Sequence, residues 1–388
     1  MIDVFKVSDF KSLVEVEVNL GLVNVFIGAN GSGKSNLLEA VGVLGAAASG
    51  RVNDESLMHR GVRPGRPALY KSSFKNKPES PDIRFEAEGF GASYAVSLVN
   101  PLEKPSPNWG FKTELLLLGK DELVGRSPNS YEQLNQFAGL SALKIVEYLP
   151  THPALQLLTA LQNYAIYAPD TPTLRGLEPD PQSREPVGLA GGSLPDGVSS
   201  LDESAKEEID DLLQLVDWLS SLETVNANQL PIAKSVPQTQ RGLRFLDRHM
   251  NTGRNTLSGY DASEGVLYLL FCAVLALHPD TPKLFAIDNF DQALNPRTAR
   301  DFTAMFCNWL IASEDRQVLL TTHNPLVLDG LPLQDDRIRL FAVDRTKSGR
   351  TVIERVVVNE SLIRAAEKGI PLSQQWVMGS FGGVPPSV

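Results

Sequence analysis

Apolar and polar residues alternate over residues 1–27, which predicts two strands that meet at a turn near Asn19–Gly21. The second of these strands, Leu22 to Ile27, leads directly into a glycine-rich loop. Beyond the loop the apolar spacing becomes helical, and a helix is predicted from Ser35 to about Ala48. Its apolar positions are Leu37, Leu38, Val41 and Leu44. The chain is therefore expected to begin as strands, a loop and a helix.

The next segment, residues 49–80, is rich in Gly, Pro, Arg and Lys and is predicted to be a mobile surface loop. Three short apolar runs separated by turn residues follow it. These runs are Ile83–Glu88, Ser93–Val99 and Phe111–Leu118. Their length and spacing predict strands of an antiparallel sheet.

The middle of the chain has helical periodicity. It extends from Tyr131 to Leu161, is interrupted by a Pro/Gly-rich stretch at Pro169 to Gly197, and resumes in an amphipathic helix over about Leu201 to Leu222. The apolar stripe of this helix is typical of core packing, although a partner surface would show the same pattern. Its members are Ile209, Leu212, Leu213, Leu215, Val216 and Leu219. No heptad run is long enough for a coiled-coil arm.

The final third alternates between helices and strands. The predicted elements are a buried helix at 266–277, a strand at 284–287, a helix at about 296–312, a strand at 317–321 and strands near 338–344 and 351–358. The tail beyond Ala366 has no regular pattern, and its Trp376 and Gly379–Gly383 could dock on a partner or on the chain itself.

Together these elements predict an α/β fold with a mixed central sheet flanked by helices and a short helical insert. The expected divisions are an N-terminal lobe at 1–125, the helical insert with its linker at 126–240, a C-terminal lobe at 241–345, and a terminal strand and tail at 346–388.

Composition limits the partners of this chain. Its 388 residues carry a formal net charge of −10 at pH 7, which argues against a broad nucleic-acid-binding surface. A local basic groove is an alternative to an ordinary solvated loop in the densest positive segment. That segment contains Arg51, Arg60, Arg63, Arg66, Lys71, Lys75 and Lys77.

No membrane or secretory segment is expected. The start of the chain lacks the apolar core and cleavage site of a signal peptide, and the longest apolar run, Val266 to Leu277, is too short to span a bilayer. The cysteines, Cys272 and Cys307, lie far apart in apolar surroundings without metal-ligand spacing. This pattern indicates reduced core thiols in a cytoplasmic protein.

The strongest chemical signal is the loop Gly28–Ser35, with the sequence GANGSGKS. It fits the P-loop pattern, in which glycines let consecutive backbone N–H groups point at a phosphate and the next helix adds its positive N-terminus. We expect Lys34 to bridge the β- and γ-phosphates of ATP and Ser35 to ligate Mg²⁺. The predicted nucleotide contacts are Asn30, Gly31, Ser32, Gly33, Lys34, Ser35 and Asn36.

A second carboxylate completes the predicted metal site. Asp288 directly follows the apolar run 284–287, where a P-loop enzyme holds its metal through water, although a lone Asp there would otherwise cap a turn or helix. Asn289 comes next, and an amide cannot accept a proton from an attacking water. Asp291 is the nearest other carboxylate, at a position that normally faces a dimer partner. These residues predict slow hydrolysis.

Several segments resemble one family, the SMC, RecF and OLD-like ATPases of the ABC class. The resemblance rests on Asp9-Phe10-Lys11-Ser12 with the following IGANGSGKSNLLEA run, and on a degenerate signature at Ala262-Ser263-Glu264-Gly265. It implies that Lys11 helps to hold nucleotide phosphates. It also implies that Ser263 and Gly265 contact the γ-phosphate bound to the opposite subunit. Without the resemblance, Ser263 would be interpreted as a helix N-cap.

Two further motifs extend the resemblance. Asp291–Pro296 is similar to the D-loop of that family, and Val318–Pro325 is similar to its switch strand, with His323 as the sensor of the γ-phosphate. The Q-loop has no clear counterpart, and Gln162 is its nearest candidate. The family resemblance implies a P-loop NTPase of the SMC-head type that closes as an ATP-sandwiched homodimer, with Lys34, Asp288, Asn289 and His323 as the catalytic positions.

Three roles for the ATP compete at this point. The first is a nucleotide-gated regulatory subunit that holds a separate effector such as a nuclease, as in anti-phage systems with Septu-like ATPase–nuclease pairs. The second is a RecF-like repair ATPase that binds duplex DNA through the basic segment. The third is a transporter subunit, which the opening strands and tail resemble less. The acidic chain and its apolar stripe favour a protein partner, and Asn289 favours a long-lived closed state.

Overall fold

The centre of the molecule is a sheet whose inner strands are apolar on both faces. In the computed structural model, which describes residues 1–75, 80–127, 134–233, 235–236 and 240–384, strands β3 (Val23–Ile27), β12 (Leu284–Ile287) and β13 (Gln317–Thr322) are buried at every position. Such runs are typical of parallel strands covered by helices on either side. β13 pairs in parallel with both β3 and β12.

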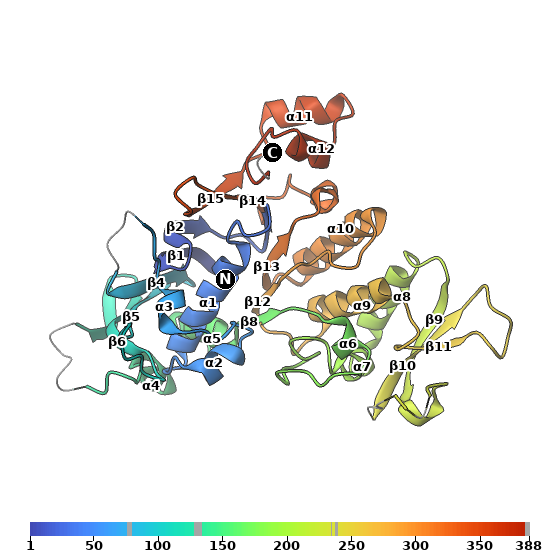
Figure 1. Cartoon of the computed structure of the whole chain (residues 1–388), viewed down its shortest axis with the longest axis horizontal. Helices are drawn as coiled ribbons and strands as arrows, with labels where there is room; N and C mark the ends of the chain where they lie inside the picture. Colours follow the sequence, from blue (N-terminus) through green and yellow to red (C-terminus); the bar gives the residue numbers. More distant parts are fainter. Residues whose placement is uncertain (76–79, 128–133, 234, 237–239, 385–388) are drawn as a thin grey trace.

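This central sheet has six strands in the order β15–β14–β3–β13–β12–β8 (Figure 1). β8 (Ala165–Tyr167) and β14 (Ile338–Arg345) are also parallel to their neighbours, whereas β15 (Thr351–Val356) is an antiparallel edge strand. The predicted mixed sheet flanked by helices is therefore confirmed.

A second, antiparallel sheet of six strands lies on one side of it, in the order β2–β1–β4–β5–β6–β7. The three predicted strands of this sheet are confirmed. Its members are β1 (Ile2–Phe10), β2 (Leu13–Asn19), β4 (Asp82–Gly89), β5 (Ala92–Val99), β6 (Gly110–Leu118) and β7 (Asp121–Arg126).

The prediction of a single strand before Asn19 is wrong, because the chain reverses at Lys11–Ser12. Asp9 and Lys11 have positive φ angles of 62° and 49° there. Neither Gly nor Pro marks this turn, and the apolar alternation resumes at once after it, so the pattern gave no sign of the reversal.

Helix α1 (Lys34–Ala48) lies between the two sheets, and almost all of its residues are buried. It packs with α5 (Pro153–Asn163) against the antiparallel sheet and one face of the central sheet. Alternate residues of β3 serve the two faces: Phe26 belongs to this core, whereas Val25 and Ile27 belong to the core on the other side.

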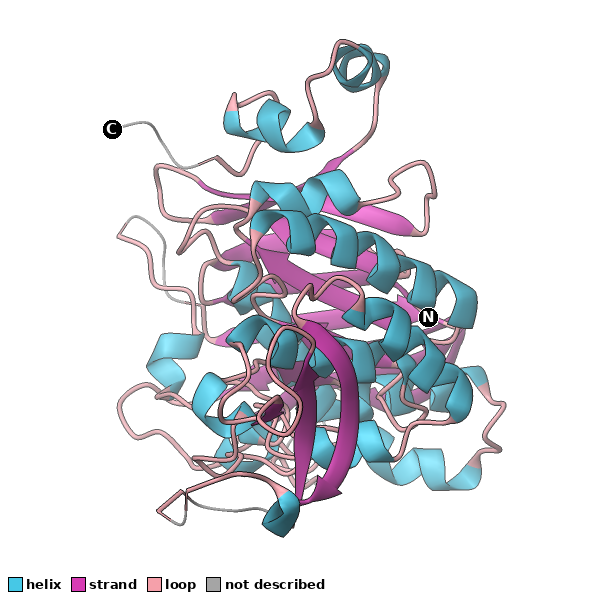
Figure 2. Cartoon of the chain, turned by 90° about the vertical axis from the view of Figure 1, so that its right-hand side faces the viewer, coloured by secondary structure: helices cyan, strands magenta, loops and turns pink. Residues whose placement is uncertain are grey.

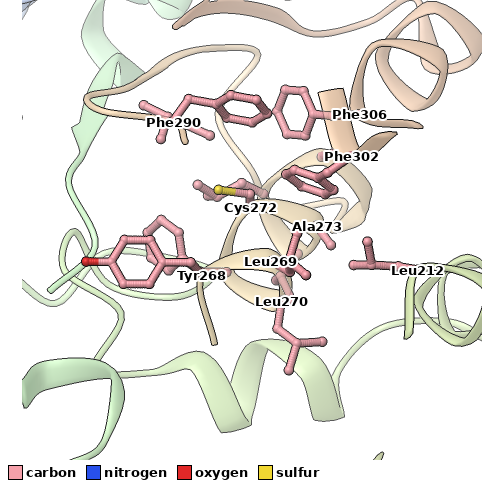
Figure 3. Packing of buried hydrophobic residues seen from close by; sticks show 14 of the residues in the cluster. Leu212, Tyr268, Leu269, Leu270, Cys272, Ala273, Phe290, Phe302 and Phe306 are labelled. Atoms are coloured by element: carbon pink, nitrogen blue, oxygen red, sulfur yellow. The ribbon is translucent and has the colours of Figure 1, made fainter. Parts of the chain in front are cut away.

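The opposite face of the central sheet is covered by α9 (Glu264–Leu277) and α10 (Pro296–Ser313). Figure 3 shows Phe290 packing with Phe302 and Phe306 of α10, above the residues of α9. Cys272 and Cys307 are buried free thiols, as predicted, and burial raises the pKa of Cys307 to about 12.

An outer lobe, residues 203–258 as far as they are described, extends from this core. It contains α8 (Glu203–Leu213) and a three-stranded antiparallel sheet of β9 (Leu219–Asn226), β10 (Arg241–Asp247) and β11 (Thr256–Ser258). Figure 2 shows its long strands in front of the helices that cover the central sheet.

The predicted single helix over residues 201–222 is therefore wrong. The chain leaves the helix after Leu213 and enters β9 at Leu219. Leu215, Val216 and Leu219 continue the helical spacing, but they pack against the same core from a turn and a strand. The apolar pattern therefore predicted correctly which residues pack against the core, but it did not predict the backbone conformation at these positions.

Two other segments are more ordered than predicted. Residues 49–80 contain α2 (Asp54–Met58) and α3 (Pro67–Tyr70), and the tail contains α12 (Leu372–Val377) after α11 (Glu360–Glu367). The Pro/Gly-rich stretch contains α6 (Thr171–Leu174) and α7 (Leu194–Ser199), and the remaining short elements are α4 (Ser141–Lys144), η2 (Ile145–Glu147), η3 (Ala227–Gln229) and η4 (Pro325–Gly330). Tyr131 and Lys77 lie outside the described residues.

Within the described part of the chain, none of the helices has both the length and the apolar character needed to cross a bilayer.

Candidate nucleotide site

The phosphate loop joins β3 to α1, as predicted. Gly31 and Gly33 adopt positive φ angles of 78° and 113°, which glycine tolerates without steric cost. A Cβ at Gly33 would lie 2.1 Å from the hydroxyl oxygen of Thr351, so only a glycine fits there. The loop therefore has the tight turn, and α1 the free N-terminal N–H groups, that suit an anion.

Lys34 lies folded over this loop. Its ammonium donates to the carbonyls of Gly28 at 2.7 Å and Ala29 at 3.0 Å. Burial lowers the pKa of Lys34, and the nearby carboxylates of Asp288 and Asp291 oppose that shift. A lysine ammonium at the mouth of an amide-lined loop is placed to meet a phosphate oxygen.

Ser35 and Asp288 face each other across the end of the central sheet. The Ser35 hydroxyl donates to the Asp288 carboxylate at 2.9 Å from Oδ2, and Thr321 at the end of β13 donates to the same carboxylate. A hydroxyl and a carboxylate beside a phosphate loop are the oxygen ligands that Mg²⁺ takes from proteins, with substrate phosphates and water supplying the rest. The described residues contain no cluster of three His, Cys, Asp or Glu side chains that would hold a metal without a nucleotide.

Asn289 has a left-handed backbone, with φ at 57°. Its N–H donates to the Thr321 hydroxyl at 2.9 Å, and the N–H of Phe290 donates to the Thr321 carbonyl at 3.0 Å. Asparagine enters this backbone region more readily than most residues. Thr321 thus holds the backbone at residues 289 and 290 through its hydroxyl and its carbonyl, and the side chain of Asn289 is an amide.

Asp291 is buried within the subunit, with 5% of its surface exposed, rather than open toward a dimer partner. Its Oδ1 has no hydrogen-bond partner among the described residues. The Asp291 side chain thus packs inside its own subunit, and the placement of its backbone toward a dimer partner stays a prediction.

The Lys11 turn is fastened to the phosphate loop. Ser12 Oγ accepts from the Asn36 side-chain amide at 2.8 Å and lies 2.7 Å from Thr351 Oγ1. Thr351 Oγ1 in turn lies 2.7 Å from the carbonyl oxygen of Ser32. Sequence reasoning missed Thr351, because it stands in an edge strand far along the chain and belongs to no motif.

Lys11 itself is held by Glu39 of α1, in an ion pair where the lysine and glutamate side chains are 17% and 3% exposed. The rings of Phe10 and Tyr70 lie 5.3 Å and 5.1 Å from its ammonium. Arg63 pairs with the other Glu39 oxygen at 2.6 Å. Glu39 was not predicted as a site residue, although its place one turn after Ser35 was a signal that could have found it.

The signature residues lie at the start of α9. Ser263 is exposed, and although it occupies the N-cap position its side chain makes no capping hydrogen bond. A Cβ at Gly265 would lie 3.0 Å from the Ala293 carbonyl, so the signature packs against the D-loop segment. The ordinary capping explanation for Ser263 is therefore absent from this structure.

His323 directly follows β13 and is exposed. The next residue, Asn324, accepts from the N–H of Leu326 at 3.0 Å and so begins η4. His323 therefore lies at the same edge of the sheet as Asp288, because β12 and β13 are parallel neighbours.

Gln162 is placed away from this site. Its side-chain amide donates to the Ala48 carbonyl at 2.8 Å, at the C-terminal end of α1. A helix of 15 residues puts that end about 20 Å from the phosphate loop. Gln162 is therefore not the Q-loop residue, and the candidate drawn from the sequence is wrong.

The positive segment that could form a basic groove is partly buried. Arg60 is 4% exposed and donates to the carbonyls of Ser56 and Gln162, and Lys71 is 9% exposed and donates to the Pro81 carbonyl. Arg63 pairs with Glu39. Arg51, Arg63, Arg66 and Lys75 are exposed, and the Arg63 side chain is 69% exposed despite its pair with Glu39.

The sheet order, the phosphate loop and the Ser35–Asp288 pair define a P-loop ATPase with the fold of an SMC head. The fold matches a crystal structure of an SMC head bound to the C-terminal winged-helix domain of ScpA, with TM-score 0.56 and 13% identity, over 93% of this chain and 99% of that one. It also matches the Smc head with an extended coiled coil bound to the C-terminal domain of ScpA derived from Pyrococcus furiosus, with TM-score 0.51 and 11% identity, over 95% and 98%.

Residues 23–329 match the family model described as "AAA domain, putative AbiEii toxin, Type IV TA system". The chain belongs to this family, and ATP hydrolysis is the general activity of its class.

Proposed function

We propose that the chain is a nucleotide-gated ATPase that closes as an ATP-sandwiched homodimer and holds a separate effector protein. Each phosphate loop binds ATP through residues 30–36, with Lys34 on the β- and γ-phosphates. Ser35 and Asp288 hold Mg²⁺, which supplies charge neutralisation on the phosphates. The support for these roles is the contact of Ser35 with Asp288 beside the amide-lined loop.

The dimer is supported by the position of the signature. Ser263 lies at the N-terminus of α9, and α9 covers the opposite face of the central sheet from α1. An exposed hydroxyl and helix N-terminus on that side are placed to meet the nucleotide of a second subunit. His323 and Lys11 act within the subunit that carries the phosphate loop, as sensor and phosphate ligand.

Asn289 is the single observation that carries the regulatory role. Because an amide cannot take a proton, the attacking water receives no general-base help from this position. ATP binds the closed dimer better than the open subunit and shifts the population toward closure. Slow hydrolysis then makes the closed state long-lived, and the chain acts as a latch more than as a motor.

The effector is a protein, and the setting is anti-phage defence. The name of the family refers to a toxin of a toxin–antitoxin system, and both SMC heads cited above are seen with a partner protein. The formal charge of −10 suits a protein partner better than nucleic acid.

Restoring a carboxylate tests the latch. Asn289→Glu is expected to raise ATP turnover by about 100-fold, the lower end of general-base contributions, and to shorten the lifetime of the dimer formed with Mg-ATP. Asn289→Gln is the matched control, since it changes the length at the same left-handed position without adding a base. Steady-state phosphate release and light scattering after size exclusion measure the two effects. Fast turnover by the wild-type chain that survives Asp291→Asn but not Asp288→Asn would contradict the latch.

The RecF-like alternative is weakened by the internal contacts of Arg60 and Lys71, which remove two cations of the basic segment from the surface. We expect Arg66→Glu with Lys75→Glu to leave ATP-driven dimer formation unchanged, and the wild-type chain to show no ATP-dependent, salt-sensitive retention on duplex DNA. A filter-binding series at increasing salt measures this. Loss of strong DNA binding in the double variant would restore the DNA-repair role.

A further inference from the structure

We propose that the C-terminal segment 371–384, here called the strap, is coupled to the nucleotide. It docks on the first residue of the phosphate loop and on the segment behind His323, so that ATP binding and strap docking stabilise each other. This inference rests on the proposed nucleotide site and adds a regulatory element to it.

The end of the strap lies against the phosphate loop. A Cβ at Gly383 would lie 3.0 Å from the Ile27 carbonyl and 3.5 Å from Gly28 Cα. The Gly383 N–H donates to Asp344 at 2.7 Å, and a Cβ at Gly382 would lie 2.3 Å from the same carboxylate. Two consecutive glycines therefore let the strap backbone approach the end of β14 and the start of the loop.

Gly28 is enclosed from the other side as well. A Cβ there would lie 2.2 Å from the carbonyl of Val343, the β14 residue just before Asp344. The first residue of the phosphate loop is thus held between β14 and the strap. The strap limits the positions that this residue can take, and hence the positions of the amides that follow it.

The start of the strap is anchored behind the switch histidine. The N–H and hydroxyl of Ser373 both donate to Asp329 of η4, at 2.9 Å and 2.6 Å. η4 follows His323 after a single residue. Strap docking therefore constrains the switch segment in addition to the phosphate loop.

Trp376 joins the two ends into one unit. It is 5% exposed, packs in the core of the central sheet, and donates from its indole N–H to the Gly382 carbonyl at 3.1 Å. The strap therefore docks as a folded unit, and loosening either end weakens the other.

Docking of the strap and binding of the nucleotide are therefore expected to be thermodynamically linked. If the docked strap holds the loop and the switch in the conformation that binds ATP, removing it lowers affinity, and ATP protects the strap by the same free energy. A strap that merely covers the surface would show neither effect: its removal would not change the ATP affinity, and ATP would not protect it.

The experiment compares the wild-type chain with a chain ending at Ile370, using calorimetry with Mg-ATP and amide hydrogen exchange over residues 371–384. We expect truncation to weaken ATP binding by at least about fivefold, the lower end of typical coupling between sites, and ATP to slow exchange in the wild-type strap. The melting temperature of each chain without nucleotide shows whether folding is retained.

Point variants keep the test valid if truncation destabilises the chain. Gly383→Ala and Gly379→Ala both place a Cβ at positive φ, at 90° and 77°, but only Gly383 has neighbours within 4 Å. Gly383→Ala should therefore weaken ATP binding and Gly379→Ala should not. Asp344→Ala should weaken it, and Asp344→Asn, which keeps an oxygen acceptor for Gly383, should restore it.

Three results would overturn the coupling while leaving the nucleotide site in place. They are an unchanged ATP affinity in both the truncated chain and Gly383→Ala, tighter ATP binding after truncation, and hydrogen exchange in the strap that does not change with ATP. Failure of the wild-type chain to bind Mg-ATP would overturn the nucleotide site and the coupling together.

Discussion

The central sheet and the outer lobe differ in how their strands are covered. β3, β12 and β13 are buried at every position, with helices on both faces, whereas β9 is buried only at Leu219 among its eight residues. Backbone enclosed on both sides opens only with large parts of the fold, while a partly solvated lobe opens by itself at lower cost. The nucleotide site is built on the first kind of structure, whereas the outer lobe joins the same core through residues such as Leu219 and Phe245 and leaves most of β9 outside it.

The largest expected effect contrasts two fully buried phenylalanines. Phe285→Ala in β12 and Phe245→Ala in β10 each remove a ring with 0% exposure, at a cost of about 3–5 kcal/mol. We expect Phe285→Ala to lower the stability of the whole chain and to weaken ATP binding. Phe245→Ala should loosen the outer lobe more than the central sheet, although its ring belongs to the shared core. Hydrogen exchange with thermal denaturation checks this, and equal loss of protection in both regions would show that they unfold as one.

The next effect contrasts two lysines. Lys34→Ala removes the ammonium over the phosphate loop and should weaken Mg-ATP binding by more than about 100-fold, because charge-assisted bonds to phosphate are lost. Lys206→Ala in the outer lobe removes a lysine that forms a surface pair with Glu203. It should leave the affinity unchanged. Calorimetry measures both, and binding that survives Lys34→Ala would place the nucleotide elsewhere.

The smallest effect on a single subunit is expected at the signature. Ser263→Arg should leave ATP affinity within about twofold of wild type and weaken ATP-driven dimer formation by at least about tenfold, since a bulky charge would enter the composite site. Ser204→Arg, on the exposed surface of α8, is the control and should dimerise normally. Light scattering with and without Mg-ATP measures this. Normal dimers of Ser263→Arg would move the interface away from α9.

The elements around the nucleotide were predictable because local pattern and global packing agree there. The GANGSGKS loop, the run before Asp288 and the strand before His323 each carry their own signal, and the structure brings them to one edge of the sheet. The contacts that support them were not predictable. Thr351 and Ser12 meet across 339 positions, and nothing in either neighbourhood marks the pairing.

Two of the errors in the predicted secondary structure have the same physical cause. The turn at Lys11 and the helix-to-strand change after Leu213 both occur where apolar spacing continues unbroken through a change of backbone. The spacing of apolar residues indicates which side chains face a core. A turn that contains neither Gly nor Pro does not interrupt this spacing, so the turn cannot be seen in the pattern. Arg60 and Lys71 were misplaced because burial of a charged head by carbonyl groups leaves no compositional trace.

The enclosure of α1 between two sheets has a mechanical consequence. A helix with one wet side can roll or tilt toward solvent when its end is pushed, but α1 has almost no such side. Close-packed interiors have low compressibility, so a displacement of its first turn would have to be taken up by the sheets packed against it rather than by solvent. A nucleotide-dependent shift of this helix would therefore have to move at least one of the two sheets.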